Sequence, residues 1–151
     1  MLYRVTVNKR YMPPELLYLE DPTQDDRAAI AAPLFTYNLA KGPPPDARPV
    51  AIVLRDEHGH TAGGLWGKTV YDWLYVELLS VPEHMRGQHL GADLMQRAEE
   101  IARQRGCVGA WLDTFAFQAR AFYEKLGYRT FGELADHPRG SARYFLMKRF
   151  S

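Results

Sequence analysis

Apolar and polar residues follow two different periods along this chain of 151 residues. Residues 73–81 are almost continuously apolar and rich in residues that favour β-structure, which predicts a strand buried on both faces. Residues 90–102 instead place Leu90, Leu94, Ala98 and Ile101 at helical spacing and predict an amphipathic helix. Its polar side is expected to carry Glu99 and Arg103 as an i,i+4 ion pair. Residues 108–114 form a second β-type run. The segment therefore predicts a strand–helix–strand unit with parallel strands and a right-handed crossover.

Shorter elements are predicted on both sides of this unit. Residues 49–54 and 61–68 predict a hairpin, and glycines 63 and 64 in its second strand predict a bulge or a close backbone approach. Residues 128–134 and 142–149 predict the last two strands. A helix is expected from Thr23 to about Ala40, before the Gly- and Pro-rich residues 42–45. Residues 15–20 are expected to form the first core strand, and residues 2–7 a short extra strand.

Composition restricts the class of protein and its partners. With 46% hydrophobic and 25% charged residues, the chain is ordinary for a globular protein, and its length suits one domain over residues 1–151. Nineteen basic against 18 acidic residues give a net charge of +1, so no overall field attracts nucleic acid or an anionic membrane. The lone Cys107 cannot form an internal disulfide, and no apolar run suggests a signal segment or a membrane span. We therefore expect a cytoplasmic protein with neither nucleic acid nor membrane as a partner.

The turn between the buried strand and the amphipathic helix has the most distinctive chemistry. If the helix opens at Gly87, its first N–H groups lack intrahelical partners and face the turn together with the positive end of the helix dipole. Such a site favours an anion, phosphate in particular. Neither G-x-G-x-x-G nor G-x-x-x-x-G-K-[ST] occurs in the chain, which excludes the dinucleotide and P-loop motifs. What remains is an R-x-x-x-x-G turn from Arg86 to Gly91.

This turn resembles the pyrophosphate loop [QR]-x-x-G-x-[GA] of the GNAT superfamily of acyl-CoA-dependent N-acetyltransferases, with His89 in place of its middle glycine. A side chain at this position is expected to fit a helical first turn. Residues 119–128, A-R-A-F-Y-E-K-L-G-Y, are similar to a second segment of that superfamily, A-x-x-F-Y-x-K-L-G-[FY], and follow in the expected order. The likeness covers roughly residues 51–149. It implies an α/β fold with a mixed, mostly antiparallel sheet of six or seven strands flanked by helices. Two parallel strands of this sheet would splay apart to bind acetyl-CoA.

The resemblance also implies which residues bind the co-substrate. The backbone of Leu79 and Val81 would receive the pantetheine arm as if it were an added strand. The turn would hold the diphosphate through Arg86, Gly87, Gln88, His89, Leu90 and Gly91. The hydroxyl of Tyr123 would lie near the departing sulfur and act as general acid, since its usual pKa of about 10 keeps it protonated. The alternative is that Tyr123 only packs on the sheet.

Glu77 is the candidate general base. In an alternating strand it shares a face with Leu79, and a carboxylate in an apolar strand is costly to bury ionised. We therefore expect its pKa to rise toward the range that suits a general base. The alternative is a structural ion pair with an arginine of a neighbouring element. Tyr75, on the same face, either lines an acceptor pocket or belongs to the core.

The implied function is acetyl transfer from acetyl-CoA to a primary amine of a small molecule or a peptide. Direct attack in a ternary complex is expected, because no activated nucleophile is evident. No metal is expected, since His58 and His60 lack a third ligand. Two alternatives stay open: a non-catalytic acyl-CoA-binding sensor or interaction module, and a transferase for longer acyl groups. The acceptor site is expected to be bounded by residues 23–40, the face of Tyr75 and Glu77, and residues 135–141. A homodimer is left open.

Overall fold

The computed structural model of this protein describes residues 13–151, so the predicted strand at residues 2–7 lies outside the described part. The chain divides into two compact units, one that ends at Gly42 and one that spans Pro43–Ser151. The expectation of one domain over the whole chain stays a prediction.

In the first unit the predicted helix is confirmed as α1, Gln24–Lys41. A capping box begins it: Asp26 donates its backbone N–H to the hydroxyl of Thr23, and the Asp26 carboxylate accepts the backbone N–H of Thr23 at 2.8 Å. The expected strand at residues 15–20 is wrong, because these residues form no strand. Apolar composition favours β-structure only where a neighbouring strand supplies hydrogen bonds, and composition does not reveal that partner.

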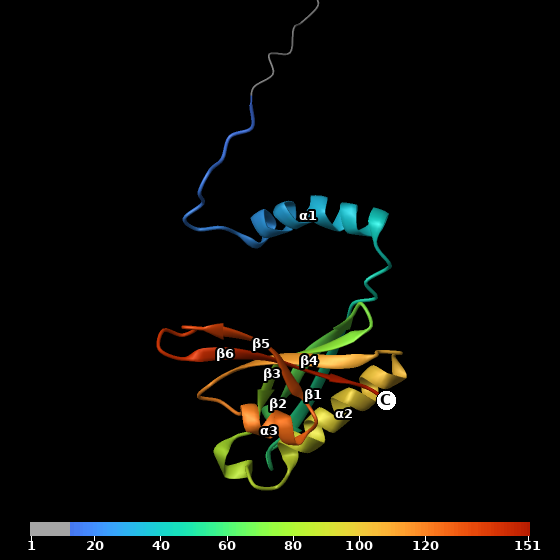
Figure 1. Cartoon of the computed structure of the whole chain (residues 1–151), viewed down its shortest axis with the longest axis vertical. Coiled ribbons are helices and arrows are strands. Elements are labelled where there is room, and N and C mark those ends of the chain that lie inside the picture. The colour runs from blue at the N-terminus through green and yellow to red at the C-terminus, as the bar shows by residue number, and fades with distance from the viewer. Residues whose placement is uncertain (1–12) are drawn as a thin grey trace, which may run out of the picture. The chain divides into compact units, whose positions relative to one another are not determined.

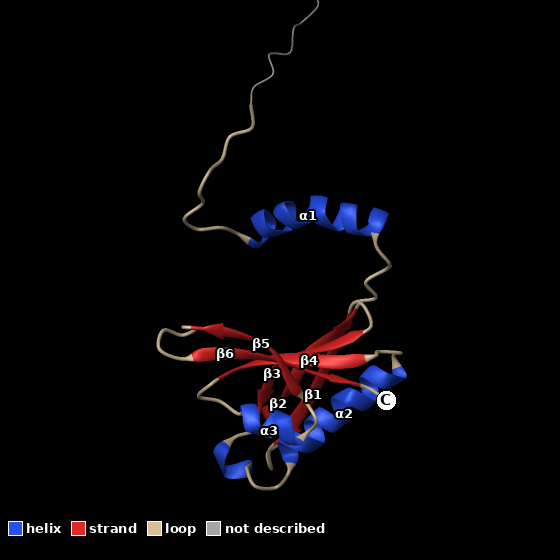
Figure 2. Ribbon diagram, viewed as in Figure 1, coloured by secondary structure: helices blue, strands red, loops and turns tan. Residues whose placement is uncertain are grey.

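The second unit is built on a six-stranded sheet with the order β1-β2-β3-β4-β6-β5 (Figures 1 and 2). Its strands are β1 Arg48–Arg55, β2 Thr61–Val70, β3 Trp73–Ser80, β4 Gly109–Phe115, β5 Arg129–Ala135 and β6 Ala142–Arg149. All neighbours are antiparallel except β3 and β4, which are parallel. The predicted mixed, mostly antiparallel sheet with one parallel pair is therefore confirmed. The predicted irregularity near Gly63 is also present, since the β1–β2 register shifts opposite this residue.

Three helical segments belong to the same unit: the short 3-10 turn Glu83–Met85, α2 Leu90–Gln104 and α3 Arg120–Lys125. α2 packs across β1, β2, β3 and β4 (Figure 1). Ala98 and Ala102 of this helix are fully buried, so their small side chains let α2 lie close to the sheet. The largest fully buried side chains are Leu74, Met95, Leu112, Leu146 and Val50. Burying an aliphatic side chain of this size contributes roughly 2 kcal/mol, so this layer fixes α2 on β3 and β4.

One residue of α2 departs from the helical-wheel prediction. Glu99 was expected on the polar side with Arg103, and the i,i+4 ion pair between them forms at 3.4 Å. Glu99 is nevertheless only 4% exposed. Its carboxylate accepts from Nζ of Lys148 at 2.9 and 3.1 Å and from the hydroxyl of Tyr128 at 3.0 Å. The expectation is wrong because partners on β6 and before β5 satisfy a charge that the helix alone would leave to solvent.

The parallel strands part after only a few residues. Their register runs from Trp73 opposite Gly109 to Val76 opposite Leu112, and pairing between β3 and β4 ends there. At the same level β2 pairs Gly67 with Val76 and Trp66 with Leu78, so Glu77 is the extra residue of a β-bulge. A Cβ at Gly67 would collide with the carbonyl of Tyr75, which explains the glycine. The bulge and the early end of pairing turn β3 away from β4.

Candidate active site

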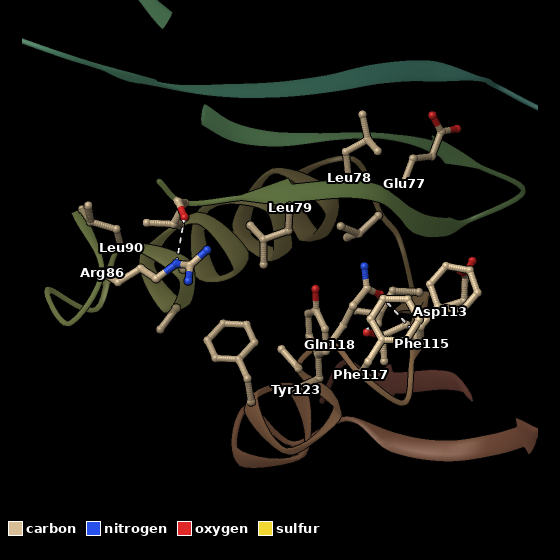
Figure 3. Close-up of a pocket in the computed structure, with 18 of the residues that line it drawn as sticks. Glu77, Leu78, Leu79, Arg86, Leu90, Asp113, Phe115, Phe117, Gln118 and Tyr123 are labelled. Carbon is tan, nitrogen blue, oxygen red and sulfur yellow. Dashed lines mark hydrogen bonds between the residues drawn. The ribbon is translucent and has the colours of Figure 1, made fainter. Parts of the chain in front are cut away.

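A cavity of about 960 Å³ lies between the parted strands (Figure 3). Its walls come from the end of β3, the turn that follows, the first residues of α2, the end of β4, the loop before α3, and α3 itself. The two segments that carry the sequence motifs therefore face one cavity, although the α2 helix and a strand separate them in the chain.

The turn supplies backbone donors to this cavity. The N–H groups of residues 87–92 donate to no carbonyl or side chain among residues 13–151, and most of these residues line the cavity. Arg86 is held at the end of β3, where its Nε donates to the carbonyl of Val81 at 3.2 Å. These donors sit at the positive end of the α2 dipole. The arrangement suits an anionic group with several acceptor oxygens.

The conformation of the turn corrects the sequence-based expectation. α2 begins at Leu90 rather than at Gly87, because Gly87 has φ of 80° and His89 has φ of 61°. His89 was expected in a helical first turn, but it is the residue before the helix and adopts the left-handed conformation. A Cβ in that region costs about 1–2 kcal/mol, which accounts for a glycine there in the related loops. The unpaired N–H groups are nevertheless present.

Glu77 does not share the face of Leu79 as the alternating pattern suggested. Because of the bulge, Glu77 and Leu78 lie on one side of β3, and Leu79 points the other way, into the cavity (Figure 3). Glu77 is one of the residues that line the cavity, but its carboxylate points to the side of Leu78, away from the cavity, and forms a 2.9 Å ion pair with Nζ of Lys68 on β2 (Figure 3). Its side chain is 29% exposed, so the expected apolar surroundings are wrong. The ion pair exists, with a lysine in place of the arginine considered.

Tyr123 lies on the opposite wall, on α3. It is 9% exposed, and its hydroxyl points into the cavity toward β3 (Figure 3). Its ring packs edge-on against Phe122 and Tyr128. Burial, and secondly the negative charge of Asp113, raise the pKa of Tyr123 to about 12. The hydroxyl therefore holds its proton at neutral pH, as a general acid must.

A cluster of polar side chains lies where β3 and β4 part, and most of its members were not predicted from the sequence. Asp113 follows Leu112, the last residue of β4 that pairs with β3, and lines the cavity. Its carboxylate accepts from Nε of Arg143 at 2.7 Å and from the hydroxyl of Tyr75 at 3.3 Å. Tyr75 stacks on Trp111 with ring centroids 4.0 Å apart, and burial followed by Asp113 raises its pKa. Tyr75 therefore supports Asp113 rather than lining the cavity. The argument that selected Glu77, a carboxylate in an apolar strand, also applied to Asp113.

Within residues 13–151, no group of three or more His, Cys, Asp or Glu side chains could hold a metal ion. In the same part of the chain, no helix is both long and apolar enough to cross a membrane.

The mixed sheet, whose parallel strands part around one cavity, has the architecture that the resemblance to acyltransferases implies. The sequence profile of the Acetyltransferase (GNAT) family matches residues 14–128. An acetyltransferase of Agrobacterium fabrum is 44% identical over 122 residues, which are 81% of this chain and 89% of that protein. The chain belongs to the GNAT family of acetyltransferases.

Two further relatives agree with this assignment. The blasticidin-S acetyltransferase of Streptomyces morookaense is 40% identical over 114 residues, 73% of this chain and 84% of its own length. A crystal structure described as an acetyltransferase of Agrobacterium tumefaciens superposes with a TM-score of 0.86 at 39% identity, covering 91% of this chain and all of that one. The protein is therefore an acyltransferase.

Proposed function

We propose that this protein transfers an acetyl group from acetyl-CoA to a primary amine of a small molecule, by direct attack within a ternary complex. The observation that carries the proposal is the shared cavity between β3 and β4. It brings together the unpaired N–H groups after Arg86, the edge of β3 that β4 leaves free, and the hydroxyl of Tyr123.

The residues present suit coenzyme A. The free N–H groups of the turn match the acceptor oxygens of its diphosphate, and Arg86 adds positive charge beside them. The edge of β3 around Leu79, no longer paired with β4, offers backbone groups to the amides of the pantetheine arm. When bound, acetyl-CoA supplies an acyl group activated as a thioester.

The side chains around the cavity would handle the protons of the reaction. The amine must be neutral to attack the carbonyl carbon, and it loses a proton as the C–N bond forms and the C–S bond breaks. Glu77 can take that proton through a water molecule, with Lys68 holding its carboxylate in place at the edge of the cavity. Tyr123 donates its proton to the leaving sulfur. No covalent intermediate on the protein is needed, because both reactants lie in one cavity.

The acceptor would occupy the end of the cavity at Glu77 and Asp113, where Phe115 and Phe117 also line the wall. Both carboxylates are paired, Glu77 with Lys68 and Asp113 with Arg143. Because these charges balance, shape and aromatic contact would select the acceptor more than net charge. The relative that acetylates blasticidin S supports a small-molecule amine over a peptide. His137, in the predicted acceptor loop 135–141, contacts Arg143 at 3.3 Å and so links this loop to the same cluster.

Two measurements test the proposal. Calorimetry should detect binding of coenzyme A, and incubation with acetyl-CoA and a panel of aminonucleosides, aminoglycosides, polyamines and lysine peptides should release free thiol with at least one amine. A melting temperature that coenzyme A leaves unchanged, together with no heat of binding, would overturn the proposal. Comparison of acetyl-CoA with longer acyl esters identifies the transferred group. The cytoplasmic location and the homodimer stay predictions.

A further inference from the structure

The side chain of Gln118 is held in one orientation in the loop between β4 and α3. Its Oε1 accepts the backbone N–H of Phe115 at 2.8 Å and the hydroxyl of Thr114 at 3.1 Å. A backbone N–H can only donate, so the atom facing Phe115 must be the amide oxygen and cannot be the nitrogen. Thr114 is only 2% exposed, which makes this anchor rigid.

The other end of the amide is consequently directed into the cavity. Because the two bonds fix the carbonyl side of the planar amide, the NH₂ group must point away from the loop. Figure 3 shows it pointing across the cavity toward β3, and Gln118 is one of the lining residues. Within the described part of the chain, Nε2 of Gln118 donates to no acceptor. The loop thus holds a fixed donor for which residues 13–151 supply no acceptor.

We propose that Nε2 of Gln118 donates a hydrogen bond to a carbonyl oxygen of the acyl-pantetheine arm, an inference that rests on the proposed function. The arm would run through the gap between β3 and β4 that this donor faces. Its carbonyl oxygens are acceptors, which is what an NH₂ group requires. The amine is a poor partner, since its ammonium form accepts no hydrogen bond and its neutral form needs the lone pair to attack. Two oxygens qualify: that of the thioester and that of the nearest pantetheine amide.

The substitution Gln118→Glu tests this contact. It keeps an oxygen for Phe115 and Thr114, so the loop should hold and the melting temperature should change by no more than about 2 °C. It removes the donor, and loss of one hydrogen bond to the ligand should raise Kd about tenfold. If both coenzyme A and acetyl-CoA bind more weakly, the partner is the pantetheine amide. If only acetyl-CoA does, the partner is the thioester.

Two controls separate the lost donor from the added charge. Gln104→Glu adds the same charge at the end of α2, on a residue that does not line the cavity, and should leave both Kd values unchanged. In Gln118→Glu, the ratio of variant to wild-type Kd should fall as the pH is lowered from about 7 toward about 4, because a protonated carboxyl group regains a donor.

A measurement on the wild-type protein needs no stable variant. The side-chain amide resonances of Gln118, assigned by their absence in the Gln118→Glu spectrum or by sequential assignment, should shift when coenzyme A or acetyl-CoA is added. Unchanged Kd values for both ligands, or unchanged amide resonances in a protein that binds them, overturn the inference and leave the proposed function standing. A wild-type protein that binds neither ligand overturns both.

Discussion

The hydroxyl of Tyr128 donates a 3.0 Å hydrogen bond to Oε1 of Glu99, a carboxylate of α2 that is only 4% exposed. Lys148 of β6 neutralises the same carboxylate. The last residue of the second sequence motif therefore does not reach the cavity but fastens α2, the helix behind the turn, to the strands that follow α3. The position of the turn relative to Tyr123 depends on this buried cluster.

We predict that Glu99→Gln lowers the free energy of unfolding by about 2–4 kcal/mol, because it leaves Lys148 without its buried counter-ion. Tyr128→Phe should cost about 1–2 kcal/mol through the lost hydrogen bond. Urea unfolding measures both. Glu100→Gln is the matched control, since the side chain of Glu100 is 41% exposed and its surface ion pair with Arg97 should matter by less than about 1 kcal/mol. Equal stability of the two glutamine variants would contradict the prediction.

Stability should also fall at alkaline pH because of two buried tyrosines. Burial is the largest cause that raises the pKa of Tyr123, to about 12, and of Tyr128 still further. A raised pKa means that the folded state keeps a proton that the unfolded state loses near pH 10. The contribution is therefore complete below about pH 10 and is lost as the pH rises through the folded-state pKa, with a slope of about 1.4 kcal/mol per pH unit for each tyrosine. Unfolding of wild type and Tyr123→Phe between about pH 9 and pH 12 should show a shallower slope in the variant.

If Tyr123 protonates the leaving sulfur, Tyr123→Phe should lower kcat by about 100-fold or more and change the Kd of coenzyme A little. Wild-type activity should show no alkaline decline from this group below about pH 10, since its pKa is about 12. Steady-state kinetics and calorimetry check both statements. Tyr144→Phe changes another tyrosine, outside the cavity lining, and serves as the control. Full activity of Tyr123→Phe would remove this hydroxyl from the mechanism.

The turn can be tested with a pair of variants at Gly87. Because φ is 80° at this position, any side chain adds backbone strain, so Gly87→Ala measures the strain alone. Gly87→Glu adds a negative charge beside the proposed diphosphate site and should weaken coenzyme A binding about tenfold or more beyond the alanine variant. Calorimetry at low and high salt should show this difference shrink as salt screens the charge. Equal Kd values for the two variants would show that no anion binds there.

Glu77 requires kinetics that separate a base from a structural ion pair. As a general base, Glu77→Gln should lower kcat/KM by about 100-fold or more and leave the Kd of coenzyme A unchanged. Lys68→Met removes its 2.9 Å partner but keeps the carboxylate, so it should have a smaller effect on kcat/KM than Glu77→Gln. If Glu77→Gln lowers only the melting temperature, the residue is structural.

Much of the fold could be predicted from local pattern. The runs that became β3, α2 and β4 carry their own periodicity, and the bounds expected for α1 and for the strands after Pro43 lie within a few residues of the observed ones. The wrong predictions share a different cause. Residues 15–20 lack a pairing strand in the structure, and Glu99 is buried because Lys148 and Tyr128 arrive from elsewhere in the chain. Such partners cannot be found from one segment alone.

The candidate site also combines residues that a local pattern reveals with residues whose roles depend on distant partners. The turn and Tyr123 lie in continuous motifs, and the structure brings them to one cavity. The face of Glu77 was wrongly predicted, because a bulge of one residue in β3 reverses the alternation and sequence spacing does not reveal it. Asp113 and Gln118 were missed because their roles depend on Arg143 of β6 and on the backbone of Phe115.

The single extra residue at Glu77 has a consequence for evolution and for engineering. Removing this residue would let β3 pair with its neighbouring strands in unbroken register. The additional hydrogen bonds would favour a sheet in which β3 and β4 stay together to their ends. Such a protein should be harder to melt and unable to admit either reactant. Selection for thermostability alone would therefore be expected to remove the irregularity that turns β3 away from β4.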